Sequence, residues 1–383
     1  MYIKSVAKNI EFSMHILINC SNLKQGGGIQ VADSICGYLN KYPKHHFVVV
    51  LSDAMEMTKK KILSFQNVSV IYYNIRNTVS SVFIQKDAFL DKCVKEEKID
   101  VVLTVFGPSR WRPKVPHLCG FARGQLLPMK TPYFDSIPIK EKLLNYVVKR
   151  SFKHDAEHYW TENTVVTELV KKILPGKNVY TVSNNYNQVF NDKSQWKNRQ
   201  LPKFDGTTLL TVSTAHSHKN LPLAIEITRH LSANHPDFNF RFVYTINEDQ
   251  FPELDEEAKK HFLFIGRVDI TECPSLYRQA DIMFQPTLLE SFTATYPEAM
   301  RMDVPIVTSD LDFAHGLCGN AAMYYPPLDA EKAAEVIYKV ANDNEIRKQL
   351  VKAGEMQLEN FLDAETRADR LIHLTEKIVE RNN

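Results

Sequence analysis

Two glutamates in the second half of the chain have a spacing and a setting suited to binding hydroxyl groups of a ligand. Glu290 and Glu298 are separated by seven residues within Q-P-T-L-L-E-S-F-T-A-T-Y-P-E-A-M-R-M-D-V-P-I-V. The first falls in a loop after an expected strand, and the second falls one to two turns into an expected helix. Carboxylates accept hydrogen bonds from hydroxyl groups, so the second can bind a ribose diol and the first another sugar. The alternative is a surface helix with two solvated carboxylates.

The turn between these glutamates is a candidate phosphate cradle. It consists of Ser291, Phe292, Thr293 and Ala294, and it leads into the expected helix. Consecutive backbone N–H groups at a helix start point toward an anion, and the helix dipole favours negative charge there. We therefore expect this turn to hold a diphosphate between two sugars.

A glycine-rich turn is a second candidate binding element. Gly26, Gly27 and Gly28 follow the expected strand 14–19 and precede an expected helix. Glycine lets the backbone approach a ligand closely, and a helix start offers N–H groups, which suits an anion or a sugar. The spacing is not G-x-G-x-x-G, and only Asp53 follows the next strand as a ribose ligand, which disfavours a dinucleotide site. The alternative is a tight strand-to-helix turn.

These candidate residues need a scaffold, and the chain offers two series of short apolar strands. The predicted strands are 14–19, 47–51, 68–73, 101–104, 117–121 and 179–182, then 209–212, 240–244, 262–265, 281–285 and 304–308. Their continuous apolar character is typical of parallel strands that are buried on both faces. Helical patterns separate them, for example over 29–39, 88–97, 220–232 and 274–280.

The series predict an α/β protein with two Rossmann-like, doubly wound parallel-sheet domains that face a cleft. A polar, aperiodic stretch over 184–206 indicates the linker. We predict an N-terminal domain over 1–190, a C-terminal domain over 207–362, and a charged C-terminal helix over 363–383 that packs on the domain surface.

The composition fits a globular protein. Hydrophobic residues make up 44% and charged residues 24% of the 383 residues, which is ordinary. No apolar run approaches the roughly 18 residues of a membrane span. The segment before Met14 lacks the apolar core of a secretory signal, so we expect none. The six cysteines form no C-x-x-C pair, which indicates reduced, mostly buried thiols and no metal cluster. We expect a cytoplasmic protein.

The charge is unevenly distributed along the chain. Residues 1–200 hold 29 lysines and arginines against 16 acidic residues, whereas residues 201–383 hold 18 against 29. A basic half favours an anionic partner such as a phospholipid, a lipid-linked phosphate or a nucleic acid. The alternative is that complementary charges steer the two halves together. Nucleic acid is disfavoured because the basic half shows no recognisable binding module.

The region of the two glutamates resembles a known motif. It looks like the E-x7-E motif of the family 4 retaining glycosyltransferases, which have the two-domain GT-B fold. The usual pattern is P-S-x-x-E-G-F-G-x-x-x-x-E-A-M-x-x-G-x-P-V-V. Ser291, Thr293 and Asp303 stand where this pattern has its three glycines. The larger side chains would narrow the donor-binding pocket, and the identity of the sugar donor stays undetermined.

The resemblance extends to the other parts of a donor site. In T-V-S-T-A-H-S-H-K-N-L, Lys219 takes the place of the family lysine that neutralises the donor diphosphate, and Thr214 stands where the family has an arginine. The candidates for the missing second cation are His216, His218 and Arg267. A lysine suits the first role as a compact cation.

Three further segments resemble the family. F-L-F-I-G-R-V, with Arg267 and Val268 at its end, resembles the strand and turn that frame the nucleotide base. Residues 318–329 match the segment G-D-A-A-x-Y-x-x-P-x-D, and Gly26–Gly28 resembles the glycine-rich acceptor-side loop. The resemblance thus covers most of the chain.

The resemblance implies a retaining hexosyltransferase that needs neither a metal ion nor a cofactor beyond its nucleotide-sugar co-substrate. The C-terminal domain would hold the donor, with Glu290 orienting the sugar and Glu298 binding the ribose. The N-terminal domain would hold a glycan or lipid-linked acceptor for surface polysaccharide synthesis. Arg123 lies at the end of a strand and is a candidate for a phosphate or sugar contact; it is as readily a surface residue. His117 is expected to be a core histidine.

A basic, amphipathic segment over 137–154 suggests an anionic membrane surface as a further partner. The apolar face is predicted to contain Leu143, Leu144, Val147 and Val148. The flanking cations are Lys140, Lys142, Lys149, Arg150 and Lys153. The alternative is a core-packed helix with a solvated basic face.

Three other functions remain open from the sequence. An NAD-dependent oxidoreductase would share the alternation of strands and helices, but its fingerprint is absent. A UDP-sugar epimerase of the same fold would carry a motif of its own. A non-catalytic nucleotide-sugar-binding protein would explain the substitutions at Thr214, Ser291 and Thr293.

Overall fold

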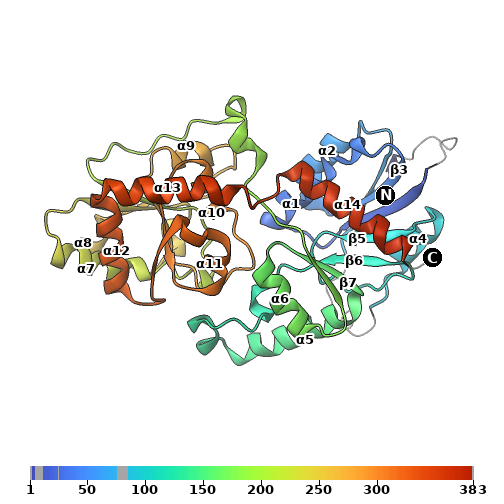
Figure 1. Ribbon diagram of the computed structural model, residues 1–383, viewed down its shortest axis with the longest axis horizontal. Coiled ribbons are helices and arrows are strands. Elements are labelled where there is room, and N and C mark those ends of the chain that lie inside the picture. Colours follow the sequence, from blue (N-terminus) through green and yellow to red (C-terminus); the bar gives the residue numbers. More distant parts are fainter. Residues whose placement is uncertain (1, 5–11, 25, 76–84, 382–383) are drawn as a thin grey trace. The chain divides into compact units, whose positions relative to one another are not determined.

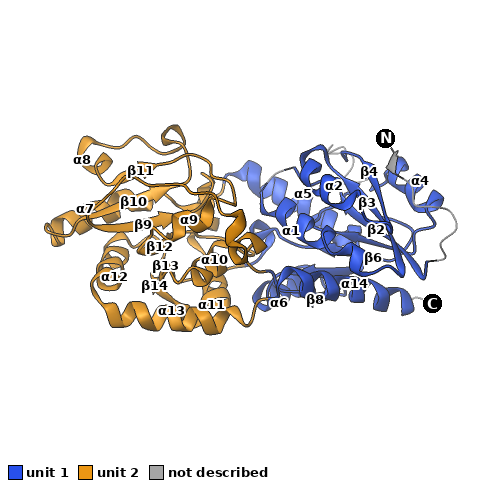
Figure 2. Cartoon of the chain, turned by 90° about the horizontal axis from the view of Figure 1, so that it is seen from above, with its two compact units in different colours: residues 1–128, 138–184, 362–383 blue, residues 129–137, 185–361 orange. Residues whose placement is uncertain are grey.

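The computed structural model describes residues 2–4, 12–24, 26–75 and 85–381. It divides into two compact units, which Figure 2 distinguishes by colour. Unit 1 contains residues 1–128, 138–184 and 362–383, and unit 2 contains residues 129–137 and 185–361. The units differ from the predicted domain ranges in three segments, because 129–137 and 185–206 pack with unit 2 and 362–383 packs with unit 1.

Unit 1 is built on an eight-stranded sheet in the order β1-β4-β3-β2-β5-β6-β7-β8, of which all but β1 are parallel. The strands are β1 (Tyr2–Lys4), β2 (Met14–Cys20), β3 (His45–Leu51), β4 (Val68–Tyr72), β5 (Val101–Thr104), β6 (His117–Gly120), β7 (His158–Thr161) and β8 (Asn178–Thr181). The six strands predicted for this half are confirmed within a few residues. The sequence analysis missed β1 and β7, and β7 lacks an aliphatic run because it reads H-Y-W-T.

Both faces of this sheet are covered, as the apolar strands require. Ile16 and Ile18 of β2 point into one fully buried cluster, and Leu17 between them points into another. Helices α1 (Gly27–Cys36), α2 (Glu56–Ile62), α4 (Ala88–Glu96), α5 (Ile139–Asp155), α6 (Thr164–Ile173) and α14 (Ala364–Glu380) belong to this unit (Figure 1). Alternating residues of a strand face opposite sides, so a two-sided core needs an unbroken apolar run.

The C-terminal helix is part of the core of unit 1. Leu371, Ile372 and Ile378 of α14 are almost fully buried and join the cluster that contains β2. Asp363 caps the helix by accepting a hydrogen bond from the Thr366 N–H. The predicted helix is therefore confirmed, and its apolar side completes the first unit.

Unit 2 has a six-stranded parallel sheet in the order β11-β10-β9-β12-β13-β14. Its strands are β9 (Thr207–Thr211), β10 (Phe240–Tyr244), β11 (Phe262–Phe264), β12 (Ile282–Gln285), β13 (Ile306–Ser309) and β14 (Ala322–Tyr325). Its helices are α7 (Leu223–Asn234), α8 (Glu256–Lys259), α9 (Cys273–Tyr277), α10 (Thr295–Arg301), α11 (Asp312–Cys318), α12 (Ala330–Asn342) and α13 (Asn344–Leu358).

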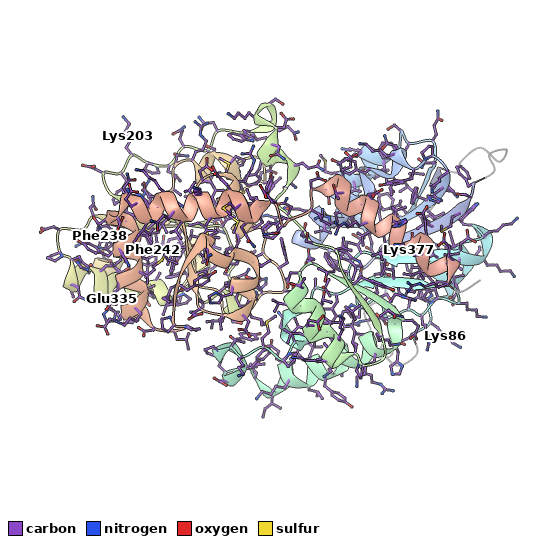
Figure 3. All side chains as sticks on the ribbon, in the orientation of Figure 1. Lys86, Lys203, Phe238, Phe242, Glu335 and Lys377 are labelled. Atoms are coloured by element: carbon purple, nitrogen blue, oxygen red, sulfur yellow. The ribbon has the colours of Figure 1, made fainter. Side chains whose placement is uncertain are left out.

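The five strands predicted for the second half are confirmed, and β14 is an addition. Phe242 lies in the core of unit 2, with Phe238 packed at its margin (Figure 3). The doubly wound α/β architecture is thus present in both halves of the chain. No described helix is long and apolar enough to cross a membrane.

Candidate functional site

The carboxyl ends of β9 and β12 bring together two residues that lie 71 positions apart in the sequence. These strands are parallel neighbours at the centre of the sheet of unit 2. Lys219 ends a short 3-10 turn (Ser217–Lys219) after β9, and Glu290 lies in the loop after β12. The Lys219 Nζ lies 2.5 Å from the Glu290 Oε1, and both side chains are nearly buried, with exposures of 14% and 8%. Ligands of parallel α/β sheets bind at such strand ends.

Further hydrogen bonds tie the two loops to each other. The Leu288 N–H donates to the His218 carbonyl at 2.7 Å. The Thr287 hydroxyl lies 2.9 Å from the Glu290 Oε1 and 3.2 Å from the His218 carbonyl. Asn220, with a left-handed φ of 50°, then turns the chain toward α7. The ion pair is therefore held in place by the backbone of both loops.

Glu298 is a buried carboxylate with one polar side-chain partner in the described structure. Its residue is 4% exposed, and the Tyr277 hydroxyl of α9 donates to its Oε2 at 3.1 Å. Burial raises the pKa of Glu298 to about 7, an effect that the hydrogen bond from Tyr277 opposes. A carboxylate with unused acceptor capacity in such a setting can accept hydrogen bonds from ligand hydroxyls. Tyr277 is a residue that the sequence analysis did not identify.

The turn before α10 differs in detail from the prediction. Helix α10 begins at Thr295, so Glu298 lies in its first turn and not one to two turns inside. Thr293 is buried, and its hydroxyl lies 2.9 Å from the Thr295 hydroxyl. Ala294 caps the helix without a side-chain hydrogen bond. The predicted residues 291–294 thus lie together between Glu290 and Glu298.

The region after β9 also carries the candidates for a second cation. Thr214 and His216 are exposed. The rings of His216 and His218 are stacked with centroids 5.6 Å apart, and the Tyr133 ring meets the His218 ring edge-on at 6.2 Å. Of the two histidines, His218 has the closer tie to the ion pair, because its carbonyl accepts from the loop of Glu290.

The predicted base-framing residues follow β11. Gly266 has a φ of 69°, and a Cβ on it would lie 2.9 Å from the Asn247 Oδ1, so the turn favours glycine. Gly266 also lines a cavity of about 460 Å³ together with residues 247–248, 259 and 262–265. Arg267 is exposed and Val268 is half-buried, and neither belongs to that lining.

Comparison with known families concerns this same region. Residues 192–357, which include Lys219, Glu290 and Glu298, match the family model described as glycosyl transferases group 1. The match covers less than half of the chain.

A curated relative extends the likeness beyond residues 192–357. The chain is 24% identical, over 242 residues, to the O-antigen chain mannosyltransferase RfbU of Salmonella typhimurium. That match spans 61% of this chain and 65% of RfbU, which is less than two thirds of the relative.

Solved structures confirm the GT-B fold for the whole chain. Sucrose-phosphate synthase from Thermosynechococcus elongatus superposes with a TM-score of 0.69 at 13% identity, covering 96% of this chain and 99% of that chain. HepE from Anabaena, in complex with UDP and glucose, superposes with a TM-score of 0.67 at 14% identity, covering 95% and 100%. A glycosyltransferase from Rickettsia africae gives a TM-score of 0.67 at 13% identity, covering 97% and 99%.

Outside residues 192–357, the glycine-rich turn of unit 1 opens α1. Gly26 has a left-handed φ of 77°, and a Cβ on Gly26 or Gly27 would meet nothing within 4 Å. A Cβ on Gly28 would lie 3.2 Å from the Leu23 Cδ2 and 3.6 Å from the Phe106 Cδ2. The first two glycines therefore face open space, whereas the third packs against the loop after β5.

Arg123 follows β6 in the same unit. Burial of the guanidinium, and then the positive charge of Arg110, lower the pKa of Arg123, although the residue as a whole is exposed. No ion pair joins it to another described residue. Asp155, which the sequence analysis missed, holds the loop of Arg110 by accepting from the Ser109 N–H at 2.6 Å. Burial raises the pKa of Asp155 to about 7.

The predicted burial of His117 and of the cysteines is confirmed. His117 is buried, with the Thr104 hydroxyl and the Asp155 carbonyl each 2.8 Å from its ring nitrogens. All six cysteines are free and buried. Within the described ranges, no group of three or more His, Cys, Asp or Glu side chains is positioned to hold a metal ion.

Proposed function

We propose that the chain is a retaining glycosyltransferase that moves a hexose-type sugar from a nucleotide-diphosphate sugar to a glycan or lipid-linked acceptor. The observation that carries this proposal is the buried pair of Lys219 and Glu290 at the carboxyl ends of β9 and β12. A lysine and a carboxylate at one strand edge can serve the diphosphate and the sugar hydroxyls of a single donor.

Each charged group has a distinct role in this proposal. Lys219 binds the diphosphate and stabilises it as it leaves, together with the backbone N–H groups of residues 292–294. Glu290, released from Lys219 when the diphosphate arrives, accepts hydrogen bonds from the donor sugar. Glu298 accepts hydrogen bonds from the ribose, for which its buried carboxylate has unused lone pairs.

The chemical step exchanges one bond at the anomeric carbon for another with retention of configuration. The bond to the diphosphate oxygen breaks, the bond to an acceptor hydroxyl forms, and the hydroxyl proton leaves on the diphosphate or in water. We propose that this step needs no metal ion and no cofactor other than the donor. His218 is our candidate for the second phosphate-binding cation because its backbone supports the loop of Glu290.

We assign the acceptor to unit 1, with Gly26–Gly28 and Arg123 as its candidate ligands. RfbU is named for mannose transfer to O-antigen chains, so a mannosyl donor and a surface-polysaccharide acceptor are the first pair to test. The proposed location is the inner face of the cell membrane, with residues 137–154 as the contacting segment.

The first experiment measures thermal unfolding with a panel of UDP, GDP and their sugars, on wild type and Glu298→Gln. A ligand that binds only the folded state raises the midpoint by mass action. We expect one nucleotide diphosphate to raise the midpoint selectively and to lose this effect in the variant. No rise with any nucleotide at millimolar concentration would contradict the donor site.

The second experiment separates the transferase from the other functions. We expect transfer of labelled sugar to an acceptor, with release of nucleoside diphosphate and retention at the anomeric carbon. Conversion of the sugar on the intact nucleotide would indicate an epimerase, and binding without turnover would indicate a non-catalytic protein.

A further inference from the structure

Helix α5 of unit 1 presents large apolar side chains to solvent. Seven large hydrophobic residues of the described structure are exposed, and four of them lie within eight positions of this helix. They are Ile139 at 85%, Leu143 at 63%, Leu144 at 55% and Tyr146 at 67% exposure. Single exposed hydrophobic residues are normal on protein surfaces, whereas a cluster on one element marks a contact with another molecule.

The inward face of the helix fixes which side chains point outward. Phe152 is fully buried against Phe121, with ring centroids 4.7 Å apart, and Val148 is 6% exposed. Asp155 is also buried. Because residues three or four positions apart share a helix face, Ile139, Leu143 and Tyr146 lie on the opposite, outward face.

This outcome corrects the predicted apolar face. Val148 packs inward and Val147 is half-buried, so neither belongs to the exposed cluster that the sequence analysis expected. Leu143 and Leu144 are exposed as expected. Ile139 and Tyr146 are the members that the sequence analysis left out.

Three cations share the outward side of α5 with these apolar residues. Lys142, Arg150 and Lys153 share the outward side by helical spacing, and all three residues are exposed. Neither Lys142 nor Lys153 takes part in an ion pair with another described residue. A helix with an apolar strip flanked by lysine and arginine lies in the plane of an anionic membrane, where the apolar side chains enter the headgroup region.

We propose that this outward face of α5 docks unit 1 on an anionic lipid bilayer. Ile139, Leu143 and Tyr146 enter the interface, and Lys142, Arg150 and Lys153 contact lipid phosphates. The partner is a bilayer because apolar and cationic side chains share one side of the helix. The acyl-chain region can take up the apolar side chains, and the anionic headgroups can pair with the cations. The inference rests on the proposed function, for which it selects a membrane-borne, lipid-linked acceptor.

Flotation of the full chain with lipid vesicles tests this proposal. Wild type is expected to float with vesicles of phosphatidylglycerol and phosphatidylcholine at low salt, and not with phosphatidylcholine alone. The variant Ile139→Ser/Leu143→Ser/Tyr146→Ser should bind at least about tenfold more weakly, because it removes the apolar contacts. Lys142→Gln and Lys153→Gln should each weaken binding about fivefold, and high salt should weaken wild type.

Matched variants on α13 control for the loss of any exposed residue. Met356 is 64% exposed there, and Lys352 is exposed on the same helix, so Met356→Ser and Lys352→Gln should bind vesicles as wild type does. Nucleotide binding by unit 2 and the unfolding midpoint should stay unchanged in every α5 variant. Unchanged nucleotide binding in an α5 variant that no longer floats would show that membrane docking failed while the proposed function stood.

Two outcomes would overturn the proposal. One is equal flotation of wild type and the triple serine variant, or equal flotation with neutral vesicles. The other is a wild-type dimer that the triple variant converts to a monomer without any vesicle binding, because the outward face would then be an interface between two copies of this chain.

Discussion

In unit 2 the loops that follow the central strands are joined by charged and polar side chains, whereas in unit 1 the equivalent turn contains two glycines that face open space. Lys219, Glu290 and Thr287 form one hydrogen-bonded group at the carboxyl ends of β9 and β12. After β2, the Asn22 side chain donates to the Phe106 carbonyl at 2.7 Å, and the Ser52 hydroxyl donates to the Leu23 carbonyl. A Cβ on Gly26 would touch nothing.

This difference separates a preformed site from an open one. A buried ion pair keeps both charges compensated before a ligand arrives, so the side chains of unit 2 are already positioned. The ligand must then displace one partner of the pair, which reduces its affinity. The open turn of unit 1 has no such ion pair to displace, so substitutions in the two units should have unequal costs.

The largest effect is expected from Lys219→Ala. This change leaves Glu290 buried without its cation, which costs about 3–5 kcal/mol of unfolding free energy for a buried pair. Urea unfolding at neutral pH measures that cost, and binding of a nucleotide diphosphate should be lost as well. The double variant Lys219→Met/Glu290→Leu is the control, because removal of both charges should restore most of the stability. Equal stability of the single and double variants would contradict a compensated ion pair.

The next effect concerns Glu298→Gln and depends on pH. Burial raises the pKa of Glu298 from its ordinary 4.5 to about 7. The native state therefore binds more protons than the unfolded state between these values, and the free energy of unfolding falls as pH rises through this range. Glutamine does not ionise, so the variant keeps the unfolding free energy that wild type loses as pH rises. The variant should therefore be more stable than wild type at pH 8, by up to about 3 kcal/mol.

Urea unfolding at pH 4 and pH 8 checks this sign. The gain from Glu298→Gln should vanish at the lower pH, where the wild-type carboxyl group is protonated in both states. Tyr277→Phe is the matched control, because it removes the hydrogen-bond donor while Glu298 stays buried. A variant that is destabilised equally at both pH values would indicate a purely structural role for Glu298.

The sequence allowed the fold to be predicted well and the site only in part. Apolar runs such as 101–104 identify parallel strands because burial on both faces needs them. The spacing of Glu290 and Glu298 identified the loop and helix after β12. Tyr277 could not be found in this way, since its hydrogen bond to Glu298 depends on how α9 packs, which no local pattern encodes.

The same limit explains the error on α5. Its sequence has apolar residues on more than one side, so periodicity alone does not tell which of them face the core. The buried contact of Phe152 with Phe121 makes that choice, and it turns Val148 inward and Tyr146 outward. Long-range packing thus decided which side chains are exposed.

A smaller effect is expected from Glu290→Gln, which should raise the affinity for nucleotide and lower the transfer activity. Glutamine carries no charge and frees Lys219 for the diphosphate, so free nucleoside diphosphate should bind about tenfold more tightly, or about 1.4 kcal/mol. Transfer should fall because the donor sugar loses its carboxylate partner. Calorimetry with UDP and GDP measures the first effect, and an assay with labelled donor measures the second. Weaker nucleotide binding in the variant would refute competition between Glu290 and the diphosphate.

The smallest effect on nucleotide binding is expected in unit 1, and it distinguishes the two units most directly. Gly26 has a φ of 77° and a ψ of −162°, a backbone conformation open essentially only to glycine, and no neighbour that a Cβ would strike. Gly26→Ala should therefore cost about 1–3 kcal/mol from backbone strain alone. Gly27→Ala is the matched control, since this residue also faces open space but has no left-handed φ, and it should change stability by much less. Urea unfolding measures the stability of both variants.

Nucleotide binding in unit 2 should stay unchanged in both glycine variants, whereas acceptor use should fall if the open turn admits the acceptor. A loss of nucleotide affinity in Gly26→Ala would instead mean that the turn in unit 1 belongs to the donor site.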